Sequence, residues 1–435
     1  MSDISFVRTE FVEPSPPPAN SVGPIRWMKD NLFSGPVNSI LTVVAVGFIA
    51  FLLAELMPWL IDSSWAPAEM SLKGCRAEVS GACFAVINER FYQFIFGFYP
   101  AELYWRPTLA FLLLIVALWP VLFESAPRQL WVHTAVYPLI AYWLIWGGSI
   151  WGPMMVLAGP VVGYLINTRG GDFISSIVGE AFGPLLTLIA SVLAVILWFL
   201  FAVVPLDGIL SSIIPIGLEP VQSDKLGGFM LSLIIGVVGI AASLPIGVCL
   251  ALGRQSNLFI VRAICVGFIE CMRGVPLITL LFVASTLLAY FLPPGTTFDL
   301  ILRVCIMVTF FASAYMAEVI RGGIAALPKG QYEAGDAMGL TYWQSMQLVI
   351  LPQALKISIP NIVSTFIGLF KDTTLVIVIG LLDPLGLSGA IRADANWNGI
   401  VWELYGFIAL FFFIFCFSMS RYAAYLEQKL KTDHR

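Results

Sequence analysis

Residues 326–352 read ALPKGQYEAGDAMGLTYWQSMQLVILP and separate two long apolar runs. A helix that begins near Gln331 is expected to end at Gly339, because glycine readily adopts the left-handed conformation that closes a helix. Thr341, with Gln344 three residues later, forms a capping-box pattern that begins a second helix. The stretch therefore predicts two short helices joined at a glycine and able to dock into the groove of a partner. Three aromatic or apolar side chains are expected to be available for contact: Tyr332, Met338 and Trp343.

Apolar runs dominate the rest of the chain. Of its 435 residues, 59% are hydrophobic and 11% are charged, which is more apolar than a water-soluble core requires. Runs of about 20 apolar residues cross a bilayer as helices, which satisfy their own backbone hydrogen bonds there. We therefore expect an all-α, polytopic integral membrane protein with about ten transmembrane helices. The expected spans are 39–61, 107–124, 130–147, 150–167, 184–206, 227–252, 259–291, 300–323, 359–382 and 400–421.

Basic residues predict the orientation of these spans, because Lys and Arg gather in cytoplasmic loops. The loop after 252, the stretch 326–352 and the tail after 421 are flanked by Lys or Arg, whereas 292–299 has neither. The basic regions are expected in the cytoplasm. Counting back through five spans places the N-terminus there too, and the segment near 62–106 outside.

Two cysteines, Cys75 and Cys83, lie in this outer segment. Disulfides persist outside the cytoplasm, but sequence spacing does not fix the Cα geometry that a bridge needs. A disulfide and two free thiols therefore both stay open. The other five cysteines lie in apolar runs and are expected to be small buried hydrophobes.

Charged residues occur inside the apolar runs, where they usually face protein or a water-filled path. Glu270 with Arg273, and Glu318 with Arg321, are three residues apart and can pair on one helix face. We interpret them as structural, self-neutralising pairs near the cytoplasmic side. A direct functional role is the alternative.

The stretch Lys371-Asp372-Thr373-Thr374 differs because it lies in mid-span without a counter-charge outside itself. An amino acid zwitterion carries one carboxylate and one ammonium group, which a Lys beside an Asp and two hydroxyls complements. Transporters place substrate sites at this depth, on locally broken helices. We interpret the four residues as part of a substrate path, with an internal salt bridge as the alternative.

The stretch 326–352 resembles the EAA loop of ABC importer permeases, whose pattern is Glu-Ala-Ala, three residues, Gly, nine residues, Ile, any residue and Leu-Pro. Gly335 replaces the second Ala, which should weaken the helix by about 1 kcal/mol, and Val349 replaces Ile. Five residues match at the right spacing: Glu333, Ala334, Gly339, Leu351 and Pro352.

The resemblance continues in order and spacing through 269–277, 314–324 and 369–375, which are similar to the polar amino acid uptake branch of these permeases. It covers 227–425 and implies a five-helix, type I importer core with 326–352 as its coupling segment. The first half resembles the long permeases of Aap- and Bzt-type systems for glutamate, glutamine, aspartate and asparagine. The implied organisation is a cytoplasmic disordered tail at 1–38, a five-span extension at 39–226, the core, and a cytoplasmic tail at 426–435.

The resemblance implies a permease in the bacterial inner membrane that imports polar L-amino acids from the periplasm. It implies three protein partners: a cytoplasmic ATPase dimer that holds ATP and Mg and acts on the coupling segment, a periplasmic amino-acid-binding protein, and a paralogous permease. Membrane lipid surrounds the chain, and no nucleic-acid partner is expected. The sequence contains no Gly-x-x-x-x-Gly-Lys-[Ser/Thr] phosphate loop, so we expect no cofactor, no metal and no catalytic residue in this chain.

Two other functions fit parts of the sequence. An ion-coupled secondary transporter has the same hydropathy, but predicts internal repeats and no exposed docking loop. An intramembrane serine protease needs a base near its nucleophile, and the weak match around Ser388 has only the distant His133 within a span. The chain also lacks the His-Glu-x-x-His of a metalloprotease, and His133 is expected to be an ordinary packed or interfacial side chain.

Overall fold

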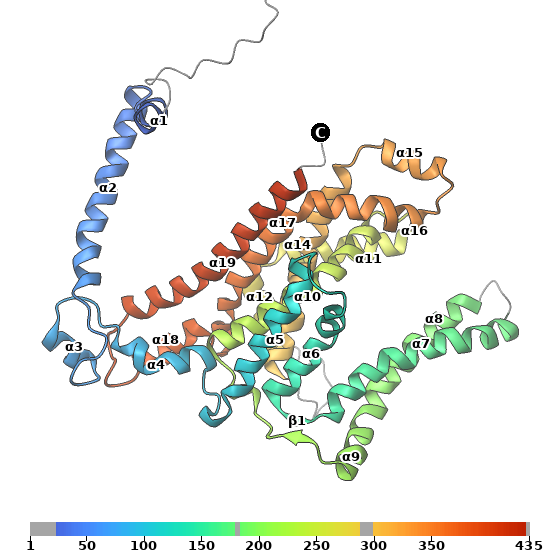
Figure 1. The fold of residues 1–435 in the computed structure, drawn as a ribbon. Helices are drawn as coiled ribbons and strands as arrows, with labels where there is room; N and C mark the ends of the chain where they lie inside the picture. Colours follow the sequence, from blue (N-terminus) through green and yellow to red (C-terminus); the bar gives the residue numbers. More distant parts are fainter. Residues whose placement is uncertain (1–22, 179–182, 288–298, 432–435) are drawn as a thin grey trace, which may run out of the picture. The chain divides into compact units, whose positions relative to one another are not determined.

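The computed structural model describes residues 23–178, 183–287 and 299–431. Its regular structure is helical apart from two short strands, β1 (Gly148–Ser149) and β2 (Gly217–Leu218), which pair antiparallel (Figure 1). The chain divides into two compact units, Met1–Ala85 and Val86–Arg435. The prediction of an all-α membrane protein is confirmed.

The first unit contains one long apolar helix, α2 (Pro36–Ile61), whose mean hydropathy of 2.5 suits a membrane span. It begins three residues before the predicted boundary, with proline at its start, where a missing N–H costs nothing. A short helix, α1 (Pro24–Asn31), precedes it, so the prediction of a disordered tail through residue 38 is wrong for this part. Residues 1–22 lie outside the described part. The third helix of the unit is α3 (Leu72–Glu78).

The second unit begins with α4 (Ala85–Phe96), followed by two apolar helices, α5 (Trp105–Leu122) and α6 (Leu130–Trp146), that pack against each other. Polar side chains of α6 bond to backbone carbonyls of α5. His133 Nε2 lies 3.1 Å from the Leu113 oxygen, and the Thr134 hydroxyl donates to the Ala117 oxygen at 2.7 Å. His133 is thus the packed side chain that the sequence suggests.

A helical hairpin follows between β1 and β2. One arm is α7 (Trp151–Val178), and the other is formed by α8 (Gly183–Leu197), the π-helical η2 (Trp198–Ala202) and α9 (Val203–Ile213). The two ends of the hairpin are adjacent, because the N–H of Ile150 donates to the Ile216 oxygen at 3.1 Å. We call 151–213 the hairpin.

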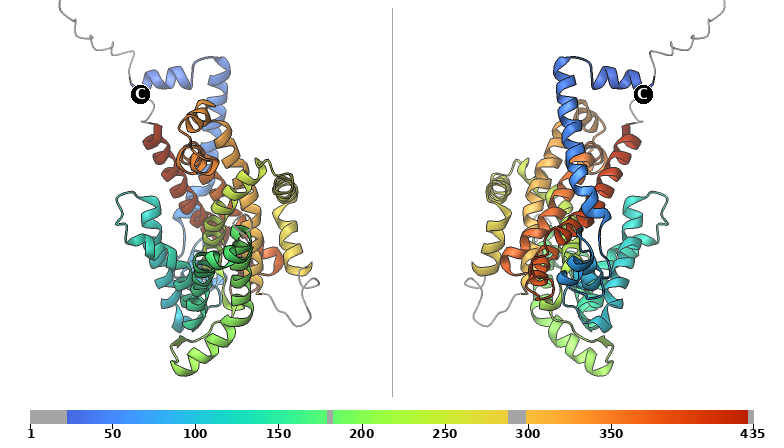
Figure 2. Two further views of the ribbon diagram at one scale, coloured as in Figure 1. Left: turned by 90° about the vertical axis from the view of Figure 1, so that its right-hand side faces the viewer. Right: turned by 90° about the vertical axis from the view of Figure 1, so that its left-hand side faces the viewer.

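The core, residues 228–431, is built around α14, which packs against α10, α11 and α17 (Figures 1 and 2). At Gly247 of α10, a Cβ would lie 2.7 Å from the Met316 Cβ, so only glycine permits this approach to α14. The main helices are α10 (Gly228–Arg254), α11 (Phe259–Gly274), α12 (Leu277–Phe282) with η4 (Val283–Leu287), α14 (Leu300–Ala325), α17 (Leu351–Asp372) with η6 (Thr373–Ile379), and α19 (Trp402–Lys431).

The predicted span 259–291 contains two helices and not one, α11 followed by α12 with η4. Its two parts are bent by 104° between Gly274 and Leu277. Pro276 causes the break, because it has no N–H to donate and pushes the residue before it out of the helical region; Val275 is extended, with φ −114° and ψ 134°. Residues 288–291 lie outside the described part.

In the described ranges, seven helices are long and apolar enough to cross a membrane, and the broken pair makes an eighth candidate. Two further predicted spans, 130–147 and 150–167, correspond to α6, which has only 17 residues, and to α7, which does not reach the same apolar standard. The count of about ten is roughly consistent with these elements. At the other end, α19 continues to Lys431 and replaces the first part of the predicted tail at 426–435.

A connection between the core and α4 lies after η6. The helix α18 (Pro384–Arg392) begins at Asp383, whose carboxylate accepts the N–H of Gly386 at 2.9 Å. Arg90 of α4 bonds to Asp394 at 2.6 Å, and Trp397 nearby in the chain is fully buried. Two short 3₁₀ turns complete the fold: η1 (Ala101–Leu103) and η3 (Ser223–Lys225).

Candidate functional site

The coupling segment leaves α14 and forms α15 (Gly330–Ala337). The helix closes at Gly339, where φ is +69°. The N–H of Leu340 donates to the Gly335 oxygen at 3.1 Å, and that of Gly339 donates to the Asp336 oxygen at 3.0 Å. This is the paired bonding of a Schellman motif, so the predicted end at Gly339 is confirmed.

The predicted capping box begins α16 (Tyr342–Ser345). The N–H of Thr341 donates to Gln344 Oε1 at 2.9 Å, and the N–H of Gln344 donates to Thr341 Oγ1 at 3.4 Å. The helix does not stop after one turn, however, but continues through the π-helical η5 (Met346–Ile350) into α17. Only the first of the two expected short helices is therefore short, and Leu351 and Pro352 lie at the start of α17, directly after the π-helical η5.

The coupling segment is fixed to the core on one side. Met346 and Ile350 are buried in a cluster with Ile269 of α11 and Met316 of α14. Gly335 is buried against α16, and a Cβ on it would lie 2.6 Å from the Ser345 Oγ. This contact disfavours the alanine that the family pattern has at this position.

The opposite side of the segment is open. Met338 is 72% exposed, Trp343 68% and Tyr342 52%, and Glu333 and Ala334 on α15 are also exposed. Exposed apolar patches rimmed by polar groups mark sites of protein interaction. We call these five residues the coupling face.

Glu318 on α14 is the centre of a charge network. Its carboxylate lies 2.7 Å from Arg254, 2.9 Å from Arg321 and 3.9 Å from Arg273. Its side chain is only 16% exposed, and partly buried carboxylates need such partners. The predicted contact of Glu318 with Arg321 is therefore present.

The predicted contact of Glu270 with Arg273 is absent from the described part of the chain. Glu270 bonds instead to Arg254 at 2.9 Å, and Arg273 reaches Glu318. Arg254 ends α10, and the packing of α10 against α11 and α14 brings it between the two glutamates. The sequence contained Arg254, but its partners are 16 and 64 residues away, so local spacing could not reveal them.

Lys371, Asp372, Thr373 and Thr374 lie where the helix changes character. The α-helix α17 ends at Asp372 and continues as the 3₁₀ helix η6 from Thr373. Thr373 is fully buried, and its hydroxyl donates to the Phe370 oxygen at 2.8 Å, whereas Lys371 is exposed. Neither Lys371 nor Asp372 forms an ion pair within the described ranges, which disfavours the internal salt bridge in this chain by itself.

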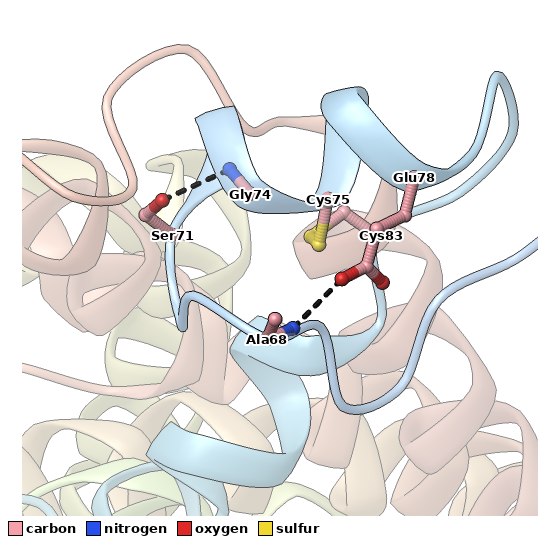
Figure 3. The surroundings of a disulfide bond; sticks show 6 residues. All are labelled: Ala68, Ser71, Gly74, Cys75, Glu78 and Cys83. Atoms are coloured by element: carbon pink, nitrogen blue, oxygen red, sulfur yellow. Dashed lines mark hydrogen bonds between the residues drawn. A yellow bond between two sulfur atoms is a disulfide. The ribbon is translucent and has the colours of Figure 1, made fainter.

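Cys75 and Cys83 form a disulfide, with their Cα atoms 5.7 Å apart (Figure 3). Ser71 begins the helix that holds Cys75, and its side chain accepts the N–H of Gly74 at 3.0 Å. Glu78 at the end of this helix accepts the N–H of Ala68 at 2.8 Å. The bridge therefore closes a small, internally hydrogen-bonded loop, and of the two alternatives the disulfide is the one that the structure contains.

The same loop is joined to the end of α2. The Ser80 hydroxyl and its N–H donate to the Asp62 carboxylate at 2.6 and 2.9 Å, and these bonds hold the pKa of Asp62 below its usual value.

The chain was compared with known proteins. The family model for the binding-protein-dependent transport system inner membrane component matches residues 243–432. The glutamate/glutamine/aspartate/asparagine transport system permease protein BztC of Rhodobacter capsulatus is 55% identical, and the alignment covers 100% of both chains. The inner membrane amino-acid ABC transporter permease protein YhdY of Escherichia coli is 40% identical over 96% of each.

A shorter relative matches only part of the chain. The probable glutamine ABC transporter permease protein GlnM of Bacillus subtilis is 31% identical, and the alignment covers 95% of that protein but 49% of this chain. The family model likewise matches only the second half of the chain, residues 243–432. The chain belongs to the family of amino-acid ABC transporter permeases, as a long member of it.

Proposed function

We propose that this chain, with a paralogous permease, forms the pore of an importer that moves glutamate, glutamine, aspartate, asparagine or a broader set of polar L-amino acids from the periplasm to the cytoplasm. A separate ATPase dimer, which binds ATP and Mg, supplies the energy. A periplasmic binding protein delivers the amino acid. The names of the two full-length relatives support this substrate class.

The coupling segment carries the proposal. It is exposed on the coupling face and fixed to α11 and α14 on the other side through Met346 and Ile350. A push on the coupling face is therefore transmitted to the helices of the pore, because close-packed interiors do not absorb strain. We assign the binding of the ATPase to this face, which includes Glu333 and Ala334. We assign supporting roles in the same coupling segment to Gly335 in α15, to Gly339 just after it, and to Leu351 and Pro352 at the start of α17.

The orientation of the chain follows from the same assignment. If the ATPase binds the coupling face, the ends of α10 and α14 and the start of α11 lie in the cytoplasm, as do both termini. The disulfide of Cys75 and Cys83 then lies in the periplasm, where such bridges persist.

We assign Lys371 to Thr374 to the substrate path. The change from α-helix to 3₁₀ helix at Thr373 alters the backbone bonding over the last seven residues of the helical run that ends at Ile379, and transporters bind substrates at such locally altered helices. Replacing Lys371 with Met is expected to abolish uptake and to leave assembly with the ATPase intact, while Lys371→Arg, which keeps the charge, retains part of the uptake. Loss of assembly in Lys371→Met would assign the residue to the structure instead.

The experiment that tests the proposed function uses the complete transporter in proteoliposomes. The binding protein and the labelled amino acid are supplied outside, ATP is enclosed inside, and uptake of the label is measured. Gly339→Val places a β-branched residue at φ +69°, where it is strained, whereas Gly339→Asn is tolerated there. Nothing lies within 4 Å of a Cβ at this position, so the two variants differ in backbone conformation and not in packing. We expect Gly339→Val to lose ATP-driven uptake and Gly339→Asn to keep it; uptake without ATP, or equal uptake by both variants, would contradict the proposal.

A further inference from the structure

A basic cavity lies beside the Glu318 network. It has a volume of about 540 Å³, within the range of ligand sites. Its lining contains three arginines from three helices and no acidic residue. The lining residues are Arg254, Gln255, Arg262, Val266, Arg321 and Ala325.

The charges around this cavity are not balanced. Arg254 and Arg321 contact Glu318, and Arg254 also contacts Glu270. Arg262 forms no ion pair among the residues that the structure describes. With Arg273 included, four arginines face two glutamates, which leaves an excess of two positive charges at the ends of three packed helices.

The surroundings of the cavity are apolar. Phe259, three residues before Arg262 on α11, is 82% exposed, and the apolar Val266, four residues after Arg262, lines the cavity. The helix α11 is also part of the broken pair that is apolar enough to enter the membrane. A ligand that fits must therefore combine an anionic group with an apolar body, since a soluble anion would leave these side chains uncovered.

We propose that the cavity binds the phosphate of an anionic phospholipid, held by Arg254, Arg262 and Arg321, with its acyl chains against the apolar residues of α11. Basic cavities between membrane helices on the cytoplasmic side bind such headgroups, and arginine is suited to phosphate because its planar guanidinium donates two parallel hydrogen bonds. The bound phosphate offsets the positive excess and fixes the end of α10 to α11 and α14. The cytoplasmic placement rests on the proposed function, whereas the phosphate site does not.

The test uses the complete transporter in nanodiscs of phosphatidylcholine with increasing fractions of phosphatidylglycerol. Retained lipid is counted by native mass spectrometry, and the unfolding temperature is measured in parallel. Arg262→Gln is the informative variant, because Arg262 has no ion pair to lose within the described part. Arg262→Lys keeps the charge, and Arg421→Gln removes an exposed arginine of α19 that does not line the cavity.

We expect Arg262→Gln to bind phosphatidylglycerol about fivefold more weakly, the change that loss of one basic contact gives, and to match the wild type in phosphatidylcholine alone. Arg262→Lys, which keeps the charge but not the two parallel hydrogen bonds, should bind more weakly than the wild type and more tightly than Arg262→Gln, and Arg421→Gln should stay close to the wild type. Equal binding of both lipids, unchanged binding by Arg262→Gln, or a lower unfolding temperature of Arg262→Gln in phosphatidylcholine alone would overturn the proposal.

In a further arm, inorganic phosphate replaces the anionic lipid. The same stabilisation by phosphate, lost in Arg262→Gln, would assign the cavity to a soluble anion and overturn the lipid assignment. Because no step measures transport, failure here leaves the proposed function unaffected.

Discussion

The core helix α14 and the hairpin differ sharply in what surrounds them. In the apolar 18-residue stretch of α14, 56% of the residues are buried within this chain. In the corresponding stretch of the hairpin arm Leu186–Ile213, 11% of the residues are buried. Neither the cluster around Leu231 and Val304 nor the cluster around Ile269 and Met316 contains a residue of the hairpin among the side chains that the structure describes. In this chain, the core helices pack against one another, while the hairpin packs chiefly against itself and presents apolar side chains outward.

Glycine contacts show the same difference. At Gly323 in α14, an added Cβ would meet Ser358 Oγ and would lie 2.5 Å from the backbone oxygen of Ala354. At Gly163 in α7, it would lie 2.6 Å from a methyl group of Val195 and no closer than 3.7 Å to a backbone atom. Backbone cannot rotate away as a side chain can, so the core is the less tolerant region.

The largest expected effect compares these two glycines. Gly323→Ala should destabilise the protein by about 3 kcal/mol, because α14 and α17 must separate, and Gly163→Ala by about 1 kcal/mol, because Val195 can adjust. The unfolding temperatures of the two variants in the same detergent test this order. Equal losses would show that the hairpin is as tightly constrained as the core.

A second test concerns Asp383, which is fully buried at the start of α18. Burial raises its pKa to about 6. The N–H groups of Gly386 and Leu385, which donate to the carboxylate, lower the pKa and offset only part of this rise. A carboxyl whose pKa is raised on folding stabilises the folded state most at low pH, and this contribution is lost as the pH rises through about 6. The size is at most about 3 kcal/mol.

Asp383→Asn keeps a side chain that caps a helix equally well but does not titrate. The difference in unfolding temperature between the variant and the wild type should therefore grow between pH 4 and pH 7, in favour of Asn. A difference that is constant with pH would show that Asp383 does not ionise in this range.

The third test concerns the Glu318 network. Glu318→Gln leaves Arg254, Arg273 and Arg321 with reduced compensation in a partly buried place and should cost about 2 kcal/mol. Glu270→Gln is the matched control: its side chain is 54% exposed, so its loss should cost less than about 1 kcal/mol. Chemical denaturation of both variants measures the difference, and equal effects would remove Glu318 from the centre of the network.

The smallest effect separates helix propensity from packing in α15. In a Ser345→Ala background, Gly335→Ala should stabilise α15 by about 1 kcal/mol, since alanine is the better helix former, and slow its amide hydrogen exchange about fivefold. In the wild type the gain should be smaller, because the new methyl group meets the Ser345 Oγ. The same slowing in both backgrounds would show that this contact does not select glycine.

Local signals predicted the coupling segment well. The left-handed Gly339 and the capping box of Thr341 with Gln344 depend on residues within a few positions of one another, so the sequence contains the whole determinant. Prediction was poorer where distant segments meet. The role of Arg254 depends on how α10 lies against α14, and the glycine at 335 depends on Ser345 in the next helix.

Two boundaries were also wrong for physical reasons. Hydropathy alone does not register that Pro276 breaks 259–291 into two helices bent by 104°, although the proline itself is a warning. Hydropathy also does not show that one helix continues from Tyr342 in the coupling segment to Ile379, because the first residues of this helix are polar. The substrate path stays a prediction, and its four residues lie where α17 gives way to η6.

The most direct test of the coupling claim places a photo-activated crosslinking residue at Trp343, which is 68% exposed on the coupling face. A matched probe at Phe98, which is 47% exposed outside the coupling segment, serves as the control. In the assembled transporter, the account predicts that the probe at position 343 captures the ATPase subunit and the probe at position 98 does not. Capture of lipid or of this chain alone from position 343 would contradict it.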